Sequence, residues 1–138
     1  MSKTFIILSI FLLGSVLSLK SIDSEKCPSN DVIKVADKIS LSLGVNEAYL
    51  SARLEASKTV AFDTLTILVK VNGAVVLKTA QPVGVQKMNA GNIYDFEYLY
   101  PIPGIFPSGN YVIELTVSNS KNPSVVLGCH LFTWSAEN

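Results

Sequence analysis

The chain has 138 residues, with 11 Lys+Arg against 11 Asp+Glu, so it carries no formal net charge at neutral pH. Nucleic-acid binding is dominated by neutralisation of phosphates, and a near-neutral chain without a run of basic residues is a poor candidate for that role. Hydrophobic residues make up 49% of the sequence, which is enough for one domain with a substantial core.

The first residues have the features of a secretory signal peptide. Lys3 supplies a positive charge, residues 5–13 form an uncharged apolar run, and small or neutral residues follow at positions 16–18. The run is too short to cross about 30 Å of hydrocarbon, which takes about 20 residues. We therefore expect a signal peptide at residues 1–18 and one domain at residues 19–138 of a secreted or lumenal protein.

The two cysteines, Cys27 and Cys129, lie near the two ends of this domain. In an oxidising compartment an even pair of cysteines predicts a disulfide. Two unpaired buried thiols are the alternative.

Alternation of apolar and polar residues, which is typical of strands with one buried face, begins at residues 38–43. The polar residues 20–26 that precede it carry no predicted element. In residues 47–57, Ala and Leu take every second position from Ala48 to Ala56, yet Ala, Leu, Glu and Arg are also good helix formers. The strict alternation favours a strand, with a helix as the competing interpretation.

Residues 64–71 alternate again and end at Asn72-Gly73. This dipeptide predicts a type I′ hairpin turn, because both of its residues must take positive φ, and the chain should return as a strand over residues 74–79. Pro82, Gly84 and Gly91 predict a loop over residues 80–92. Further strands are predicted at residues 93–100, 110–118 and 125–134.

Seven or so short strands without a convincing helix predict an all-β fold, namely a two-sheet antiparallel, immunoglobulin-like β-sandwich. A true immunoglobulin domain would place a Trp between its cysteines, whereas Trp134 follows both. Large apolar residues share one face on two strands, and an alanine row lies on a third; these are Tyr94, Phe96, Tyr98 and Tyr100, then Tyr111, Ile113, Leu115 and Val117, and Ala48, Ala52 and Ala56. Such faces can interdigitate, or they can leave an apolar cavity between the sheets.

The residues that could carry catalysis are few. A Ser-His-Asp site needs a histidine held by a carboxylate, and the single histidine, His130, follows a cysteine. A zinc site needs three or four ligands, which one histidine and a disulfide pair do not provide. Asp95 and Glu97 share one strand face, a spacing typical of a solvated surface. We expect a non-enzymatic protein that uses no metal or other cofactor.

The segment 100–111 reads Tyr-Pro-Ile-Pro-Gly-Ile-Phe-Pro-Ser-Gly-Asn-Tyr. It resembles the ML lipid-recognition domain, in which an alternating aromatic strand runs into Ile-Pro and then into a turn with an aromatic or apolar residue, Pro, Gly and Tyr. Niemann-Pick type sterol carriers and phosphatidylglycerol/phosphatidylinositol transfer proteins are similar. The chain lacks the inner cysteines of many members, a difference that concerns the identity of the ligand more than the fold.

The resemblance implies a sandwich with an apolar cavity that holds a sterol, a phospholipid or a fatty acid between its sheets. By position, it places Phe106 and Pro107 at the cavity mouth, Tyr94 and Phe96 on the wall, Tyr111 at the base of the next strand and Val76 on the opposite hairpin. It also implies a monomer with transient membrane contact, secreted or in the endosomal or lysosomal lumen. The alternative function is a non-lipid extracellular adhesion or recognition sandwich that acts through its loops.

Overall fold

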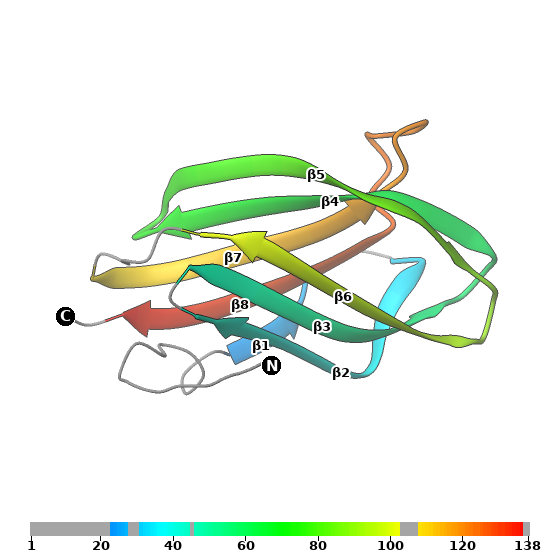
Figure 1. The fold of residues 1–138 in the computed structure, drawn as a ribbon, viewed down its shortest axis with the longest axis horizontal. Helices are drawn as coiled ribbons and strands as arrows, with labels where there is room; N and C mark the ends of the chain where they lie inside the picture. The colour runs from blue at the N-terminus through cyan, green and yellow to red at the C-terminus, as the bar shows by residue number, and fades with distance from the viewer. Residues whose placement is uncertain (1–22, 28–30, 45, 103–107, 137–138) are drawn as a thin grey trace.

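The computed structural model describes residues 23–27, 31–44, 46–102 and 108–136, and they form an all-β fold (Figure 1). The signal peptide predicted at residues 1–18 lies outside this part of the chain. No helix forms in the described residues, and therefore none there is long and apolar enough to cross a membrane. Eight strands are present in these ranges: β1 (Asp23–Lys26), β2 (Ile33–Leu43), β3 (Glu47–Ala56), β4 (Val60–Val71), β5 (Ala74–Met88), β6 (Ile93–Pro101), β7 (Gly109–Ser118) and β8 (Gly128–Ala136).

The strands form two sheets that face each other (Figure 1). The larger sheet has the order β1-β8-β7-β4-β5, and the smaller one has the order β2-β3-β6. Every neighbouring pair of strands is antiparallel. The prediction of a two-sheet antiparallel, immunoglobulin-like sandwich is therefore confirmed.

The side-chain alternation decides which face of each strand is buried. In β3, Ala52 and Ala56 are 2% and 1% exposed, while Arg53 and Glu55 point to solvent. The competing helix is thereby excluded, because a helix would place these residues at a period of 3.6 instead of 2. In β6 the aromatic face is likewise turned inward, with Phe96 5% exposed.

The Asn72-Gly73 turn forms as predicted between β4 and β5. Asn72 has φ 51° and Gly73 has φ 86°, the positive values that a type I′ turn requires. Val71 pairs with Ala74 across the turn, which sets the register at the start of the hairpin.

The predicted loop over residues 80–92 is wrong, because β5 continues as a strand to Met88. β5 is an edge strand of the larger sheet and has no neighbouring strand on its outer side. Pro82 has no backbone N–H to donate, but none is needed on that side, so Pro82 can still pair with Thr64. Gly84, at φ 76°, takes up a register irregularity between Phe62 and Thr64 of the partner strand. Proline and glycine therefore predict an interruption of a central strand, but they do not exclude an edge strand.

The polar stretch before Cys27 also forms a strand, β1, where no element was predicted. Lys26 pairs with His130, and the next residue, Cys27, is bonded to Cys129, so the predicted disulfide is confirmed. The bond joins residues 102 positions apart and holds β1 on the outer edge of β8. A strand of 4 residues has little stability of its own. The disulfide therefore helps to hold β1 in place, although its sequence shows no alternation of apolar and polar residues.

The two sheets pack tightly at the end of the sandwich where β2, β4 and β8 begin, which we call the closed end. Phe62 and Met88 are 0% and 2% exposed, and the rings of Phe62 and Phe96 meet edge to face with centroids 5.3 Å apart. The backbone N–H of Ile33 donates to the carbonyl of Leu127 at 2.8 Å, which joins the start of β2 to the chain before β8. At the closed end, side chains of the two sheets are therefore in direct contact.

Gly128 is where a side chain would disturb this contact. A Cβ added at Gly128 would lie 2.8 Å from the carbonyl oxygen of Ile33, which is backbone and cannot rotate away. We expect Gly128→Ala to lower the free energy of unfolding by about 1–3 kcal/mol, as overpacking does. Gly44→Ala is the matched control, since its Cβ would meet its nearest atom at an ordinary 3.5 Å. Urea unfolding of both variants checks this, and equal midpoints would contradict it.

The disulfide closes most of the domain into one loop. Chain-entropy arguments give a bond across about 100 residues up to about 4.7 kcal/mol of stability. The double variant Cys27→Ser/Cys129→Ser should unfold at a clearly lower temperature than the oxidised protein and at the same temperature as the reduced protein. A calorimetric scan measures this, and a variant as stable as the oxidised protein would show that the bond adds no stability.

Candidate ligand cavity

A cavity of about 390 Å³ lies between the two sheets. Every side chain that lines it is apolar or aromatic. The smaller sheet contributes Leu41, Leu43, Ala48, Leu50, Tyr98 and Tyr100, and Ile102 follows at the end of β6. Such a surface can hold hydrocarbon and has no charged group with which to bind an ion.

The opposite wall comes from the larger sheet. It consists of Leu65, Ile67, Val69, Val71, Val76, Leu77, Tyr111, Ile113, Leu115 and Trp134. Tyr111 stacks on Trp134 with ring centroids 4.8 Å apart and planes inclined by 11°. Burial raises the pKa of Tyr111 above its ordinary value of 10.0, so its phenol remains neutral and adds no charge to the wall.

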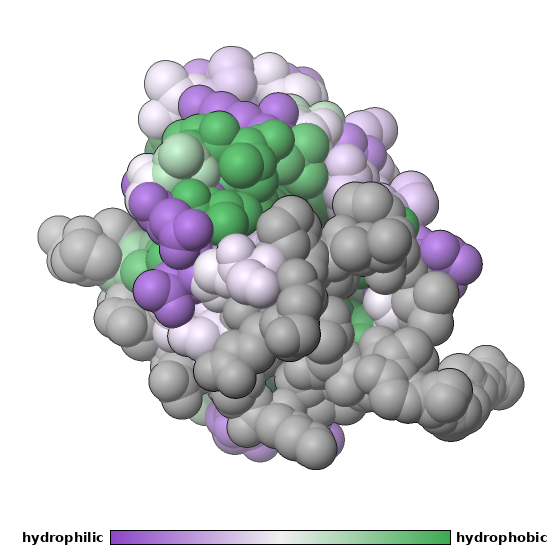
Figure 2. All heavy atoms as spheres, turned by 90° about the vertical axis from the view of Figure 1, so that its left-hand side faces the viewer, coloured by the Kyte–Doolittle hydropathy of each residue, from purple (hydrophilic) through white to green (hydrophobic). Residues whose placement is uncertain are grey.

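The cavity opens at the end of the sandwich opposite the closed end, which we call the open end. It holds the Asn72-Gly73 turn and the last residues of β6. Val76 lines the cavity and is 60% exposed, whereas Leu50 and Leu65, deeper in, are 6% and 2% exposed. Figure 2 looks onto this end and shows hydrophobic surface there beside polar side chains.

A β-bulge places Val76 at this opening. Val69 pairs with Leu77 and Lys70 pairs with Val75, which leaves Val76 as the extra residue of the edge strand. Bulges bend a strand and redirect one side chain. Here the redirected side chain is the apolar one that borders the cavity.

A second cavity, of about 50 Å³, lies further toward the closed end. Phe96, Ala52 and His130 are among the residues that line it. The His130 ring lies 5.2 Å from the ring of Phe132. This smaller cavity shares three lining leucines with the larger one.

The six residues proposed for lipid binding fall into three groups. Val76 and Tyr111 line the large cavity. Tyr94 and Phe96 do not lie on its wall: Phe96 borders the small cavity, and the Tyr94 hydroxyl donates to Gln86 Oε1 on β5. Phe106 and Pro107 lie outside the described residues.

The aromatic face of β6 was identified correctly, but the cavity borders the other half of it. Tyr98 and Tyr100, two and four positions beyond Phe96, are on the wall instead. Trp134 was also missed as a lining residue. Its pairing with Tyr111 across β7 and β8 turns both rings to the same face. The alternation in the sequence carries the signal for these residues, but not the position of the cavity along the strand.

A row of polar contacts joins β5 and β6, the edges of the two sheets, along one side of the cavity. Besides the contact of Tyr94 with Gln86, the Tyr98 hydroxyl donates to Gln81 Oε1 at 3.4 Å. Within β5, Gln81 Nε2 donates to Thr79 Oγ1 at 2.6 Å. The tyrosine–glutamine contacts bridge the sheets at an edge where the backbones do not pair.

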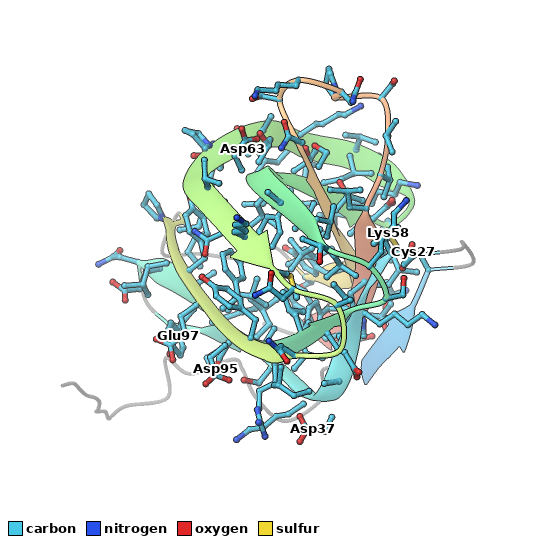
Figure 3. All side chains as sticks on the ribbon, turned by 90° about the vertical axis from the view of Figure 1, so that its right-hand side faces the viewer. Cys27, Asp37, Lys58, Asp63, Asp95 and Glu97 are labelled. Carbon is cyan, nitrogen blue, oxygen red and sulfur yellow. A yellow bond between two sulfur atoms is a disulfide. The ribbon has the colours of Figure 1, made fainter. Side chains whose placement is uncertain are left out.

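The acidic pair considered for catalysis lies away from the cavity. Asp95 and Glu97 are exposed on the outer face of the smaller sheet, as Figure 3 shows. Asp95 forms an ion pair with Arg53 at 3.3 Å, and Arg53 also reaches Asp37 at 3.1 Å. The arrangement is that of a solvated sheet face.

Three candidate metal-ligating atoms come together in the described part of the chain, from Cys27, Cys129 and Glu114, all within 4.8 Å of one another. Both sulfurs are committed to the disulfide and therefore cannot act as thiolate ligands. One carboxylate remains, which does not make a site.

No protein-family model and no curated protein sequence matches this chain. Among solved structures, it is similar to chicken MD-1 complexed with lipid IVa, with a TM-score of 0.57, 11% identity, and coverage of 89% of this chain and 96% of that one. It is also similar to the C-terminal domain of wzt, with a TM-score of 0.51, 14% identity, and coverage of 83% and 74%. At these identities the likeness shows an ML-like sandwich fold and does not show membership of the family.

Proposed function

We propose that the chain is a lipid-binding protein that holds the hydrocarbon part of a lipid between its two sheets. The observation that carries the proposal is the cavity of about 390 Å³ with walls of aliphatic and aromatic side chains. The apolar side chains that line an unfilled cavity lack packing partners, which costs stability. A bound hydrocarbon chain would supply those partners.

The likeness to MD-1 supports the same reading, because that protein was solved with lipid IVa and its fold extends over 89% of this chain. The walls here also suit hydrocarbon energetically. Each buried methylene contributes about 0.8 kcal/mol, so a bound chain gains affinity without any polar contact. Sterols, phospholipids and fatty acids all offer such hydrocarbon.

The disulfide supports a protein of an oxidising compartment, secreted or in the endosomal or lysosomal lumen. We propose a carrier without catalytic activity, which acts as a monomer. Val75 and Val76, 56% and 60% exposed at the open end, would allow brief contact with a membrane while a lipid enters or leaves.

Ala48→Trp tests this proposal by placing an indole in the cavity. Ala48 lines the wall and lies beside Tyr100 on the neighbouring strand. An indole in the cavity excludes at least two methylenes of the ligand. Each buried methylene contributes about 0.8 kcal/mol, so this loss weakens binding about tenfold. We therefore expect the affinity for a fluorescent fatty acid, measured by titration, to fall by about tenfold or more while circular dichroism stays unchanged.

Ser51→Trp is the matched control, because Ser51 lies on the opposite face of the same strand. It adds the same side chain outside the cavity and should leave binding as in the wild type. A folded Ala48→Trp variant that binds lipids as the wild type does would refute binding between the sheets. Wild-type protein that binds no lipid would favour the alternative of loop-mediated recognition.

A further inference from the structure

Three leucines separate the large cavity from the small one. Leu50 on β3, Leu65 on β4 and Leu115 on β7 line both cavities. All three are buried, at 6%, 2% and 8% exposure. Leu65 pairs with Val117, and Leu115 pairs with Ile67, so these two are diagonal neighbours on the larger sheet, and Leu50 comes from the smaller sheet. The partition is therefore built from both walls.

The two ends of the large cavity differ in how exposed their lining residues are. At the open end, Val76 is 60% exposed, and Tyr100 and Ile102 are half-buried. At the inner end the boundary is the leucine partition. A ligand that enters from the open end meets these leucines last.

The leucine partition limits how far a ligand reaches into the sandwich. A single acyl chain that enters at the open end can extend inward between the apolar walls until its terminal methyl meets Leu50, Leu65 and Leu115.

The walls also determine where the polar end of the ligand lies. A carboxylate or a phosphate would lose its hydration among these side chains without gaining a charged partner, which is strongly unfavourable. The polar group must therefore stay at the open end, in water, with the hydrocarbon pointing inward.

We propose that the large cavity binds one acyl chain, from a free fatty acid or a single-chain phospholipid, and that the partition of Leu50, Leu65 and Leu115 sets the longest chain that fits. The proposal rests on the lipid-binding function above and names its ligand class. A longer chain has to displace the leucines to reach the small cavity.

The test is calorimetric titration of the wild-type protein with saturated fatty acids from about 8 to about 20 carbons. The affinity should rise about fourfold with each methylene until the chain reaches the partition, and should then level off or fall within the series. A parallel series of lysophosphatidylcholines distinguishes the two sources. A break near the same length in either series supports the proposal and identifies the headgroup that the protein accepts.

Leu115→Ala tests the partition itself. The lost side chain opens the partition and joins the two cavities, so the break should move to longer chains. Leu77→Ala is the matched control, because Leu77 lines the large cavity without bordering the small one. It should weaken binding without moving the break. Since truncation of a buried leucine destabilises, near-ultraviolet circular dichroism checks folding, and Leu115→Val provides a milder variant with a smaller shift.

The wild-type series decides the main point even if both Leu115 variants fail to fold. An affinity that keeps rising to about 20 carbons, or a sterol that binds more tightly than every single-chain lipid, would overturn the length limit while leaving lipid binding intact. A folded Leu115→Ala variant with an unmoved break would overturn the role of the partition. Failure of every lipid class to bind would instead refute the proposed function.

Discussion

The tight packing of the two sheets at the closed end allows them to stay apart at the open end. Phe62, Met88 and Phe96 fill the space between the sheets there, and the Ile33 N–H to Leu127 carbonyl bond ties the smaller sheet to the larger one. Side-chain bridges from β5 to β6 hold one long side. With one end and one side fixed, residues at the other end can face a cavity instead of each other, and the apolar area needed for stability is buried elsewhere.

The alanine row of β3 shows how far sequence reasoning can go. Its alternation predicts correctly that Ala48, Ala52 and Ala56 share an inner face, because the side-chain period of a strand is a local property. The open question was whether these small residues accommodate aromatic rings or border a cavity. Both occur on the same strand: Ala52 lies beside Phe96 in the register and is almost fully buried, whereas Ala48 borders the large cavity. The distance between the sheets decides this, and it is a tertiary property.

The position of the cavity along the strands also explains which of the predicted lipid-binding residues line it. Tyr111 and Val76 line the cavity, but Tyr94 and Phe96 lie too far toward the closed end, where they bridge to Gln86 and pack on Phe62. The misjudged elements, β1 and the second half of β5, are both edge strands. Edge strands tolerate proline and polar residues, so their pattern is weak in the sequence. β5 nevertheless matters to the site, since it supplies Gln81 and Gln86 to the bridges between the sheets.

The central claim is that a lipid chain lies between the sheets, and its position can be measured directly. Protein with isotope-labelled Ile, Leu and Val methyl groups, mixed with an unlabelled fatty acid, gives intermolecular nuclear Overhauser effects from the acyl chain to methyls within a few ångströms. We predict such contacts to Leu65, Ile67 and Val69, which line the cavity. Contacts confined to exposed methyls away from it, such as those of Val85 at 73% exposure and Val125 at 51%, would contradict the account.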